Sequence, residues 1–496
     1  MTNYTKKVVK GSAIVFVLSA FAAVAGYAVR LIFARNLTTE EFGLFYSIFA
    51  FLAILIVFAD LGLTKALTTF ISRYRSKNDQ DAVKSSIVTV TLIHIASYLV
   101  ISFAVFLSSD FLSLHYFKVP DSSILLRLVM ISFFFNSFVY VLYYSFQGFQ
   151  KMEYFASVDL LRMIFILLIS FFLFNFGFGV LTTGIAYIAA TLLLIAVYYF
   201  ALVKKVFPDF HKAKATLSKK LTKSLLRFGI PVAIGASGTI ILGFTDTLML
   251  TFFSTLENVG LYNVAIPTSR LLWFFGAAIG STIFPLASEL QARNNLAIIK
   301  SGVELLYKYC FILILPFSLV LFSFPEIIIR LLYGESYIGA AQVLRILSIA
   351  AIAMALHQIT SNLIIGIGKP RINSRYTYIA VVFNIISNFF AIPRYGIEGA
   401  AIVSLLTFAL LLALNLFYLY KELDIVVPAK KWMLNIFAAG VFLLVVKFMK
   451  DLLNTNPWAE LAIVSILASA VYVCMVFALK LADIREIREF ISRLRQ

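Results

Sequence analysis

Charged side chains lie inside apolar stretches that are long enough to cross a bilayer, where an ionisable group costs several kcal/mol. Arg270 lies near the middle of one stretch and Arg30 lies late in another. Asp60 lies near the end of a third stretch, and Asp246 lies late in a fourth. Groups in such positions face a cavity or a charged partner. These four residues are therefore the candidates for binding charged groups or moving ions.

Each of these residues also has a structural interpretation. Arg270 can pair with another buried group instead of a ligand. Asp60 can pair with Lys65 or cap the helix that follows it. Arg30 and Asp246 lie at nearly the same depth in matching stretches, so we expect them to approach one another between two lobes.

Uncharged polar side chains near the middle of apolar stretches form a second set of candidates. His94 and His357 can be hydrogen-bonded core residues or proton carriers. Asn384 and Asn388 are four residues apart, so they share one helix face. They can bond between helices or line a polar cavity.

The composition identifies the class of protein that must position these residues. Of 496 residues, 61% are hydrophobic and 13% are charged, against about 45–50% and 25% in soluble domains. This excludes a soluble enzyme and a disordered chain. The two cysteines lie in apolar runs, so no disulfide framework is implied. The sequence predicts an all-α polytopic membrane protein.

Fourteen stretches have the length and the apolar character of transmembrane helices. The weakest boundary, between the fifth and sixth, is the break at 175–179. The predicted spans are 11–34, 42–64, 84–108, 124–147, 156–175, 179–203, 228–251, 261–286, 302–323, 343–366, 374–393, 396–420, 432–450 and 457–480.

Lysine and arginine fall mostly in the segments on one side of these spans, which predicts that both termini are cytoplasmic. The net charge of +18 follows from this bias, so nucleic acid is not expected as a partner. Eight basic residues lie in the connection 204–227. We interpret that connection as an anchor that contacts anionic lipid.

Short motifs recur at nearly constant spacing, which predicts an internal repeat. The run Glu-Glu-Phe-Gly-Leu-Phe at 40–45 matches Glu-Asn-Val-Gly-Leu-Tyr at 257–262. The other matching pairs are Lys84 with Lys300, Arg127 with Arg345, Gly148 with Gly366, and Gly177 with Gly396. Spans one to six therefore repeat as seven to twelve, related by a pseudo-two-fold axis along the membrane normal.

This repeat predicts the organisation of the chain. An N-lobe of six helices and a C-lobe of six helices flank a basic linker, and two extra spans and an amphipathic cytoplasmic tail follow. The predicted boundaries are 1–203, 204–227, 228–420, 421–480 and 481–496.

The sequence lacks the motifs for nucleotide binding, metal binding and acid–base catalysis. There is no phosphate-binding GxxxxGK[ST] loop and no Cys/His cluster for a metal. No cofactor is expected. The predicted external loops are short and carry no paired carboxylates for acid–base work. The sequence therefore indicates a protein that is not an enzyme.

The opening of each half resembles a known family. Arg-Leu-Ile-Phe-Ala-Arg at 30–35, the motif at 40–45 and Phe-Ala-Asp-Leu-Gly-Leu at 58–63 are similar to the polysaccharide-transporter branch of the multidrug/oligosaccharidyl-lipid/polysaccharide exporter superfamily, the Wzx-like flippases. Asp246-Thr247-Leu248 and the motif at 257–262 resemble that family's second opening.

This resemblance implies a flippase of the cell membrane that translocates a polyprenyl-(pyro)phosphate-linked oligosaccharide by alternating access. Arginine suits the substrate because it stays charged and binds phosphate through two parallel hydrogen bonds. By position, Arg30, Arg270 and, at the boundary, Arg35 are assigned to a cationic cavity between the lobes. Partners implied are membrane lipid, the lipid-linked glycan and glycan-assembly enzymes, and we expect a monomer.

Other functions remain open from the sequence. The chain could be a cation-coupled multidrug exporter of the same superfamily, a peptidoglycan-precursor flippase, or a membrane-embedded glycosyltransferase or ligase. Fourteen spans and an excess of arginine over aspartate within them disfavour the drug exporter. The sequence leaves the energy source open, and one hypothesis is that a proton or sodium gradient acts through Asp60 or Asp246.

Overall fold

The structure, a computed structural model, consists almost entirely of helices. It describes residues 3–273, 276, 280, 287–289, 291, 296–426, 428–453, 456–483 and 486, and these contain no strand. The chain divides into two compact units, Met1–Gly260 and Leu261–Gln496.

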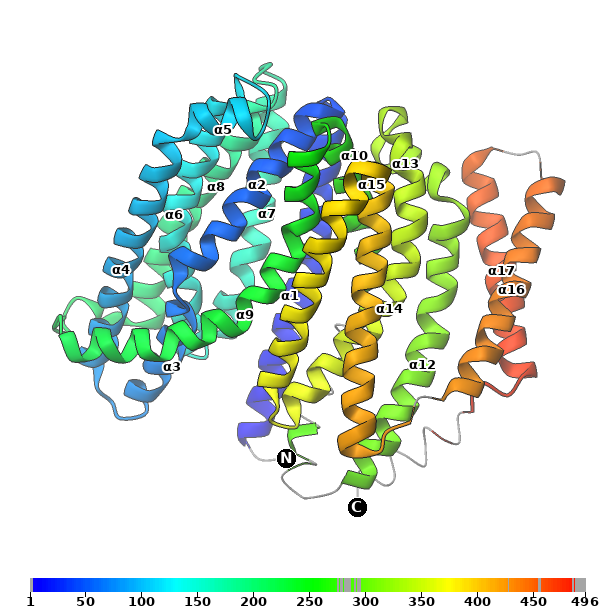
Figure 1. Cartoon of the computed structure of the whole chain (residues 1–496). Coiled ribbons are helices and arrows are strands. Elements are labelled where there is room, and N and C mark those ends of the chain that lie inside the picture. The colour runs from blue at the N-terminus through cyan, green and yellow to red at the C-terminus, as the bar shows by residue number, and fades with distance from the viewer. Residues whose placement is uncertain are drawn as a thin grey trace. The chain divides into compact units, whose positions relative to one another are not determined.

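The first unit contains nine α-helices and two short helical turns before the start of α10 (Figure 1). The helices are α1 (Asn3–Asn36), α2 (Thr39–Asp60), α3 (Leu63–Arg75), α4 (Gln80–Leu107), α5 (Ser109–His115), α6 (Ser122–Gly148), α7 (Met152–Phe174), α8 (Leu181–Ala201) and α9 (Lys219–Phe253), with η1 (Leu202–Val206) and η2 (Pro208–Phe210) before α9.

The described helices of the second unit continue from α10, which crosses the boundary between the units. They are α10 (Leu256–Arg270), α12 (Leu296–Ser323), α13 (Pro325–Tyr333), η3 (Glu335–Ala340), α14 (Ala341–Gly366), α15 (Pro370–Leu423), α16 (Ala429–Leu452) and α17 (Pro457–Ala478).

Within the described residues, twelve helices are long and apolar enough to cross a membrane. This confirms an all-α, multi-pass membrane protein. One of the twelve, α15, has non-helical backbone at Gly396 and holds the predicted spans 374–393 and 396–420. The predicted break at 175–179 is confirmed, because α7 ends at Phe174 and α8 begins at Leu181.

Two predictions fall largely on residues outside the described ranges. The eighth predicted span, 261–286, is described as far as Trp273 and then only at Gly276 and Gly280. Of the predicted amphipathic tail 481–496, the structure describes 481–483 and Glu486. The count of fourteen spans and the axis relating two lobes stay predictions, as do the predicted domain boundaries.

Local signals explain where α2 begins and ends. Thr38 and Glu41 form a capping box, in which the Glu41 N–H donates to Thr38 Oγ1 at 3.2 Å and the Thr38 N–H donates to Glu41 Oε2 at 2.9 Å. At the other end, Leu61 and Gly62 both have positive φ, 51° and 69°. This left-handed pair turns the chain from α2 into α3.

The repeated arginines make matching contacts, each inside its own unit. Arg127 of α6 pairs with Asp110 of α5 at 2.8 Å, and Arg345 of α14 pairs with Glu326 of α13 at 2.7 Å. Each acid is the second residue of a short helix. The sequence match therefore corresponds to the same ion pair, between a long helix and the short helix before it, in both halves.

Candidate functional site

Arg30 makes a cation–π contact with an aromatic ring in the first unit. Its guanidinium carbon is 4.0 Å from the centre of the Tyr46 ring, which is 9% exposed. Tyr46 packs against Phe42 and Phe45 of the same helix, α2. A cation over an aromatic face is stabilised by the ring's quadrupole, most strongly when water is excluded. This contact holds the head of Arg30 in place beside α2.

Two other candidates in this unit, Arg35 and Asp246, differ in exposure. Arg35 lies in the last turn of α1 and is exposed. Asp246 lies in α9 and is 8% exposed. Beyond it on α9, Thr251 donates to Ser47 Oγ of α2 at 2.8 Å. Arg30 and Asp246 therefore belong to the same compact unit, on two helices that both neighbour α2.

Asp60 caps the helix that follows it, as one of its two structural interpretations predicted. Its carboxylate accepts hydrogen bonds from the Gly62 N–H at 3.1 Å and from the Thr64 N–H at 3.3 Å. Thr64 Oγ1 donates to the same carboxylate at 3.0 Å. A negative charge at a helix N-terminus is favourable because it faces unpaired N–H groups. Asp60 thus fixes the turn between α2 and α3.

His94 of α4 also approaches this carboxylate. Its Nε2 lies 3.2 Å from Asp60 Oδ1, and His94 is 1% exposed. The ring does not have hydrogen-bonding geometry there, and neither ring nitrogen has another hydrogen-bond partner within the described residues. The neighbouring Tyr98 hydroxyl is likewise buried and unpartnered among them. A proton added to the His94 ring would place a positive charge beside the Asp60 carboxylate.

A second polar group lies on α6 and α7 of the same unit. Arg162 lies 3.9 Å from Asp159, three residues earlier on the same helix, and its guanidinium carbon is 5.9 Å from the centre of the Tyr140 ring. Tyr143 donates to Asp159 Oδ2 at 3.3 Å. Lys65 of α3 lies with its ammonium nitrogen 4.9 Å from the centre of the Tyr144 ring of α6. Charged and phenolic groups thus extend from α3 to α7 inside this unit.

Arg270 lies at a break in what the sequence presents as one apolar span. It is the last residue of α10 and is half-buried, and a turn follows at 271–272. Trp273, directly after the turn, donates its indole N–H to Gln358 Oε1 of α14 at 3.3 Å. The carbonyl end of a helix favours a cation. Arg270 is therefore positioned by the end of α10.

The polar candidates of the second unit bond between helices. His357 Nδ1 lies 2.8 Å from Asn415 Nδ2. Asn388 Nδ2 donates to Asn384 Oδ1 at 3.2 Å, and Asn384 Nδ2 lies 3.3 Å from Thr407 Oγ1. Asn384 and Asn388 are both almost fully buried. The Asn384–Thr407 bond joins the two arms of α15, the segments before and after Gly396, and the His357–Asn415 contact joins α14 to α15.

The structure brings together some residues that the sequence treated separately. Asp60 and His94 were both candidates, but nothing in their spacing indicated that they meet. Tyr46 and Asn415 were not identified at all, because a tyrosine and an asparagine in apolar runs carry no distinctive signal. No group of three His, Cys, Asp or Glu side chains among the described residues is placed to hold a metal ion. The role of the predicted site residues stays a prediction.

Two protein families match this chain. The family described as "Polysaccharide biosynthesis protein" matches residues 8–291, which is more than half of the sequence. The family described as "MatE" matches residues 231–390. Both matches agree with the predicted superfamily.

Relatives match over most of the length. An "uncharacterized membrane protein" of Methanocaldococcus jannaschii is 31% identical over 505 aligned positions, covering 99% of each chain. A "probable low-salt glycan biosynthesis flippase" of Haloferax volcanii is 25% identical and covers 83% of each chain.

The fold also matches a solved structure, "Lipid II flippase MurJ, inward closed conformation". The TM-score is 0.78 at 15% identity, and the match covers 95% of this chain and 100% of the other. Together with the family matches, this confirms the resemblance drawn from the motifs at 30–63 and 246–262. The chain belongs to the polysaccharide biosynthesis protein family, in the polysaccharide-transporter branch of the multidrug/oligosaccharidyl-lipid/polysaccharide exporter superfamily.

Proposed function

We propose that this protein is a flippase that translocates a polyprenyl-(pyro)phosphate-linked oligosaccharide across the cytoplasmic membrane by alternating access. The observation that carries the proposal is the family match over residues 8–291. The named relative from Haloferax volcanii, a probable glycan biosynthesis flippase that covers 83% of this chain, supports it. We place both termini in the cytoplasm and expect a monomer that works with glycan-assembly enzymes.

The arginines supply the chemistry that such a substrate needs. A phosphate or pyrophosphate cannot cross the bilayer core bare, and a guanidinium stays charged and binds phosphate oxygens in pairs. Arg30 is held by the Tyr46 ring, and Arg270 is held at the end of α10. Both are half-buried. We assign them, with Arg35 at the boundary, to the predicted cationic cavity that receives the headgroup.

The pair formed by Asp60 and His94 is the best candidate for coupling to a gradient. A proton taken up by His94 places a full positive charge 3.2 Å from the carboxylate. A proton taken up by Asp60 removes the negative charge that caps α3. Either event changes the turn between α2 and α3, so uptake of an ion can alter the conformation. Asp246 is the second candidate.

A cation-coupled multidrug exporter is the alternative function, and the "MatE" match over residues 231–390 favours it. The two proposals differ in the charge of the substrate. A cationic drug is attracted by carboxylates and repelled by Arg30 and Arg270, whereas a lipid phosphate is attracted by the arginines. An enzymatic function is not proposed, because the functionally named relatives are flippases and a transporter.

Flipping of a fluorescent polyprenyl-pyrophosphate oligosaccharide in proteoliposomes tests the proposal. We compare the wild type with Arg270→Ala, Arg270→Lys and Arg30→Ala. The matched control is Arg330→Ala, whose arginine pairs with Glu335 at the surface at 2.8 Å. We expect flipping by the wild type and the control and its loss in Arg270→Ala and Arg30→Ala. Normal flipping by Arg270→Ala places the phosphate elsewhere, and no flipping by folded wild type favours the drug exporter.

Gradient dependence is tested separately in the same vesicles. Asp60→Asn keeps the shape of the cap and removes its charge, and Asp246→Asn does the same in α9. If one of them couples, flipping by that variant no longer responds to an imposed proton or sodium gradient. An unchanged response in both variants excludes both residues as coupling groups.

A further inference from the structure

The first part of α9 is not needed to cross the membrane. The helix has 35 residues, and at 1.5 Å per residue it is about 52 Å long, against about 30 Å for the hydrocarbon core. Pro231 lies inside it, and proline bends a helix by removing a backbone donor. Figure 1 shows α9 changing direction along its length within the first unit. We call residues 219–230, before this proline, the basic arm.

One face of the basic arm is fixed to the first unit. Leu225 is fully buried in the cluster that contains Leu63 and Phe70 of α3. Phe228 adds an aromatic contact, with its ring centre 6.3 Å from that of Phe70. At Gly229 the backbones of the two segments meet, because a Cβ there would lie 2.7 Å from the Leu61 carbonyl oxygen. The arm therefore has a defined orientation on α3.

The opposite face presents three cations in a row. Lys219, Lys223 and Arg227 are spaced four residues apart, so they lie on one side of the helix, and all three are exposed. None of them makes an ion pair or a side-chain hydrogen bond with any residue that the structure describes. Two nearby lysines are engaged, since Lys212 pairs with Asp209 at 3.5 Å and Lys84 donates to the Ala213 carbonyl.

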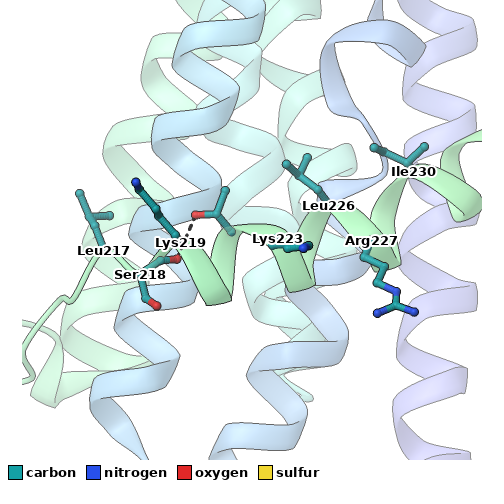
Figure 2. A pocket seen from close by; sticks show the side chains of 8 residues that line it. Leu217, Ser218, Lys219, Lys223, Leu226, Arg227 and Ile230 are labelled. Carbon is teal, nitrogen blue, oxygen red and sulfur yellow. Dashed lines mark hydrogen bonds between the residues drawn. The ribbon is translucent and has the colours of Figure 1, made fainter.

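These cations share a groove with apolar side chains. The groove has a volume of about 540 Å³, and Figure 2 shows Leu217 and Lys219 at one end, Lys223 and Leu226 in the middle, and Arg227 and Ile230 at the other end. Thr222, also in the lining, donates its hydroxyl to the Ser218 carbonyl at 3.2 Å, so it is already satisfied. The groove thus offers positive charge and apolar surface along the same line.

We propose that this groove binds an anionic bilayer lipid. The headgroup phosphate contacts Lys219, Lys223 and Arg227, and the part of the lipid's hydrocarbon chain nearest the headgroup lies beside Leu226 and Ile230. Basic residues at an anionic surface each add about 1 kcal/mol of attraction. The apolar residues distinguish a lipid from free phosphate, because a bare phosphate gains nothing from covering them. This site is separate from the proposed substrate arginines and does not depend on the flippase proposal.

The position of the groove gives the bound lipid a structural effect. The basic arm contacts the turn at Leu61 and Gly62 through Gly229, and Asp60 caps that same turn. A lipid that fixes the arm therefore also stabilises the turn between α2 and α3. Removal of the three charges is expected to loosen this turn without changing any residue in it.

Native mass spectrometry of the full-length protein tests the proposal. The probes are phosphatidylglycerol and phosphatidylcholine with identical acyl chains. The test variant is Lys219→Gln/Lys223→Gln/Arg227→Gln, and the control Lys204→Gln/Lys205→Gln/Lys212→Gln removes three charges from the preceding segment. We expect wild type and control to bind phosphatidylglycerol more tightly than phosphatidylcholine. The test variant should bind phosphatidylglycerol about tenfold more weakly or worse.

Two further measurements keep the test independent of folding. Lys219→Arg/Lys223→Arg keeps the charges and should bind like the wild type, whereas a loss there shows that the effect is not electrostatic. Inorganic phosphate is added as a competitor, and displacement of the lipid at equal concentration would overturn the assignment to a lipid. Equal loss of binding in the control variant, or equal binding of the two lipids by the wild type, would also overturn it.

Discussion

Gly43 of α2 and Gly260 of α10 lie against one another where the two helices cross. A Cβ at Gly43 would lie 1.9 Å from the Leu256 carbonyl oxygen, and a Cβ at Gly260 would lie 2.1 Å from the Thr39 carbonyl oxygen. Side chains do not fit at such distances, so only glycine permits this approach. The two glycines are also partners in the sequence repeat. Both glycines lie in the first unit, of which Gly260 is the last residue.

We expect Gly43→Ala and Gly260→Ala each to destabilise the protein by ~1–3 kcal/mol or more, because the added methyl group forces two backbones apart. Thermal unfolding of the detergent-solubilised protein measures the effect. Gly243→Ala is the control, since a Cβ added at that glycine of α9 would have nothing within 4 Å. A melting temperature for Gly43→Ala equal to that of the control would contradict the crossing.

Double-mutant cycles measure the coupling energies of the ion pairs Arg127–Asp110 and Arg345–Glu326. Arg127→Gln with Asp110→Asn, and Arg345→Gln with Glu326→Gln, should each give a coupling energy of ~0.2–1 kcal/mol, since the pairs are partly exposed. The exposed pair Arg330–Glu335 serves as the reference. A measurable coupling energy in only one of the two ion pairs would show that the repeat keeps both arginines but that only one of them stabilises the fold.

Gly396 should be intolerant of any side chain. Its φ of 55° and ψ of −134° lie in a region that residues with a Cβ avoid. We expect Gly396→Ala to destabilise the protein by ~1–3 kcal/mol. Gly440→Ala is the control, because Gly440 has helical backbone and nothing within 4 Å of its added Cβ. Equal thermal stability of the two variants would disprove a strained turn between the arms of α15.

The contacts of Glu486 make one part of the stability depend on pH. Burial alone would raise the pKa of Glu486, but hydrogen bonds and charge from Lys308 and Lys431 together hold its pKa below the usual value of 4.5. A carboxyl group with a lowered pKa in the folded state stabilises the protein above 4.5, and this contribution is lost as the pH falls through the lowered value. Lys308 is 4% exposed and depends on this partner.

We therefore expect Glu486→Gln to lower stability by ~1–3 kcal/mol at neutral pH, because a buried ammonium group loses its anionic partner. The difference from the wild type should shrink below pH 4.5. Thermal unfolding across a pH series provides the measurement. Adding Lys308→Met to Glu486→Gln should restore stability, since the buried charge is then absent. A difference between wild type and Glu486→Gln that is independent of pH would refute the assignment.

The sequence predicts helices better than it predicts the ends and breaks of helices. Long apolar runs identified the spans, and the glycines at 177 and 396 identified two turns, because both signals are local. Arg270 was expected in the middle of a continuous span, yet it ends α10, since a break inside an apolar run leaves hydropathy unchanged. Similarly, α9 begins at Lys219, nine residues before the predicted span 228–251, because the polar residues at its start are not apolar enough to indicate a span.

Contacts between distant helices were the least accessible part of the site. Asp60 was one of the expected helix caps, and the partners that the structure gives it, Gly62 and Thr64, follow directly in the chain. Its approach to His94 depends on how α2 packs against α4, and the spacing of the two residues does not encode that. The contact between Arg30 and the Tyr46 ring could not be predicted from the sequence for the same reason. Residue type identified the candidates, whereas packing determined their partners.

Backbone carbonyl groups near the C-terminal ends of two membrane helices accept hydrogen bonds from side chains elsewhere in the chain. Tyr116 donates to the Leu248 carbonyl and Lys118 to the Phe252 carbonyl, both at 3.0 Å, near the end of α9. Lys450 donates to the Ser323 carbonyl at the end of α12. Synthesis runs from the N-terminus, so the donors for α9 have already been translated when that helix emerges from the ribosome. The end of α12, by contrast, acquires its donor from a lysine translated 127 residues later, so this bond forms only after α16 has been made.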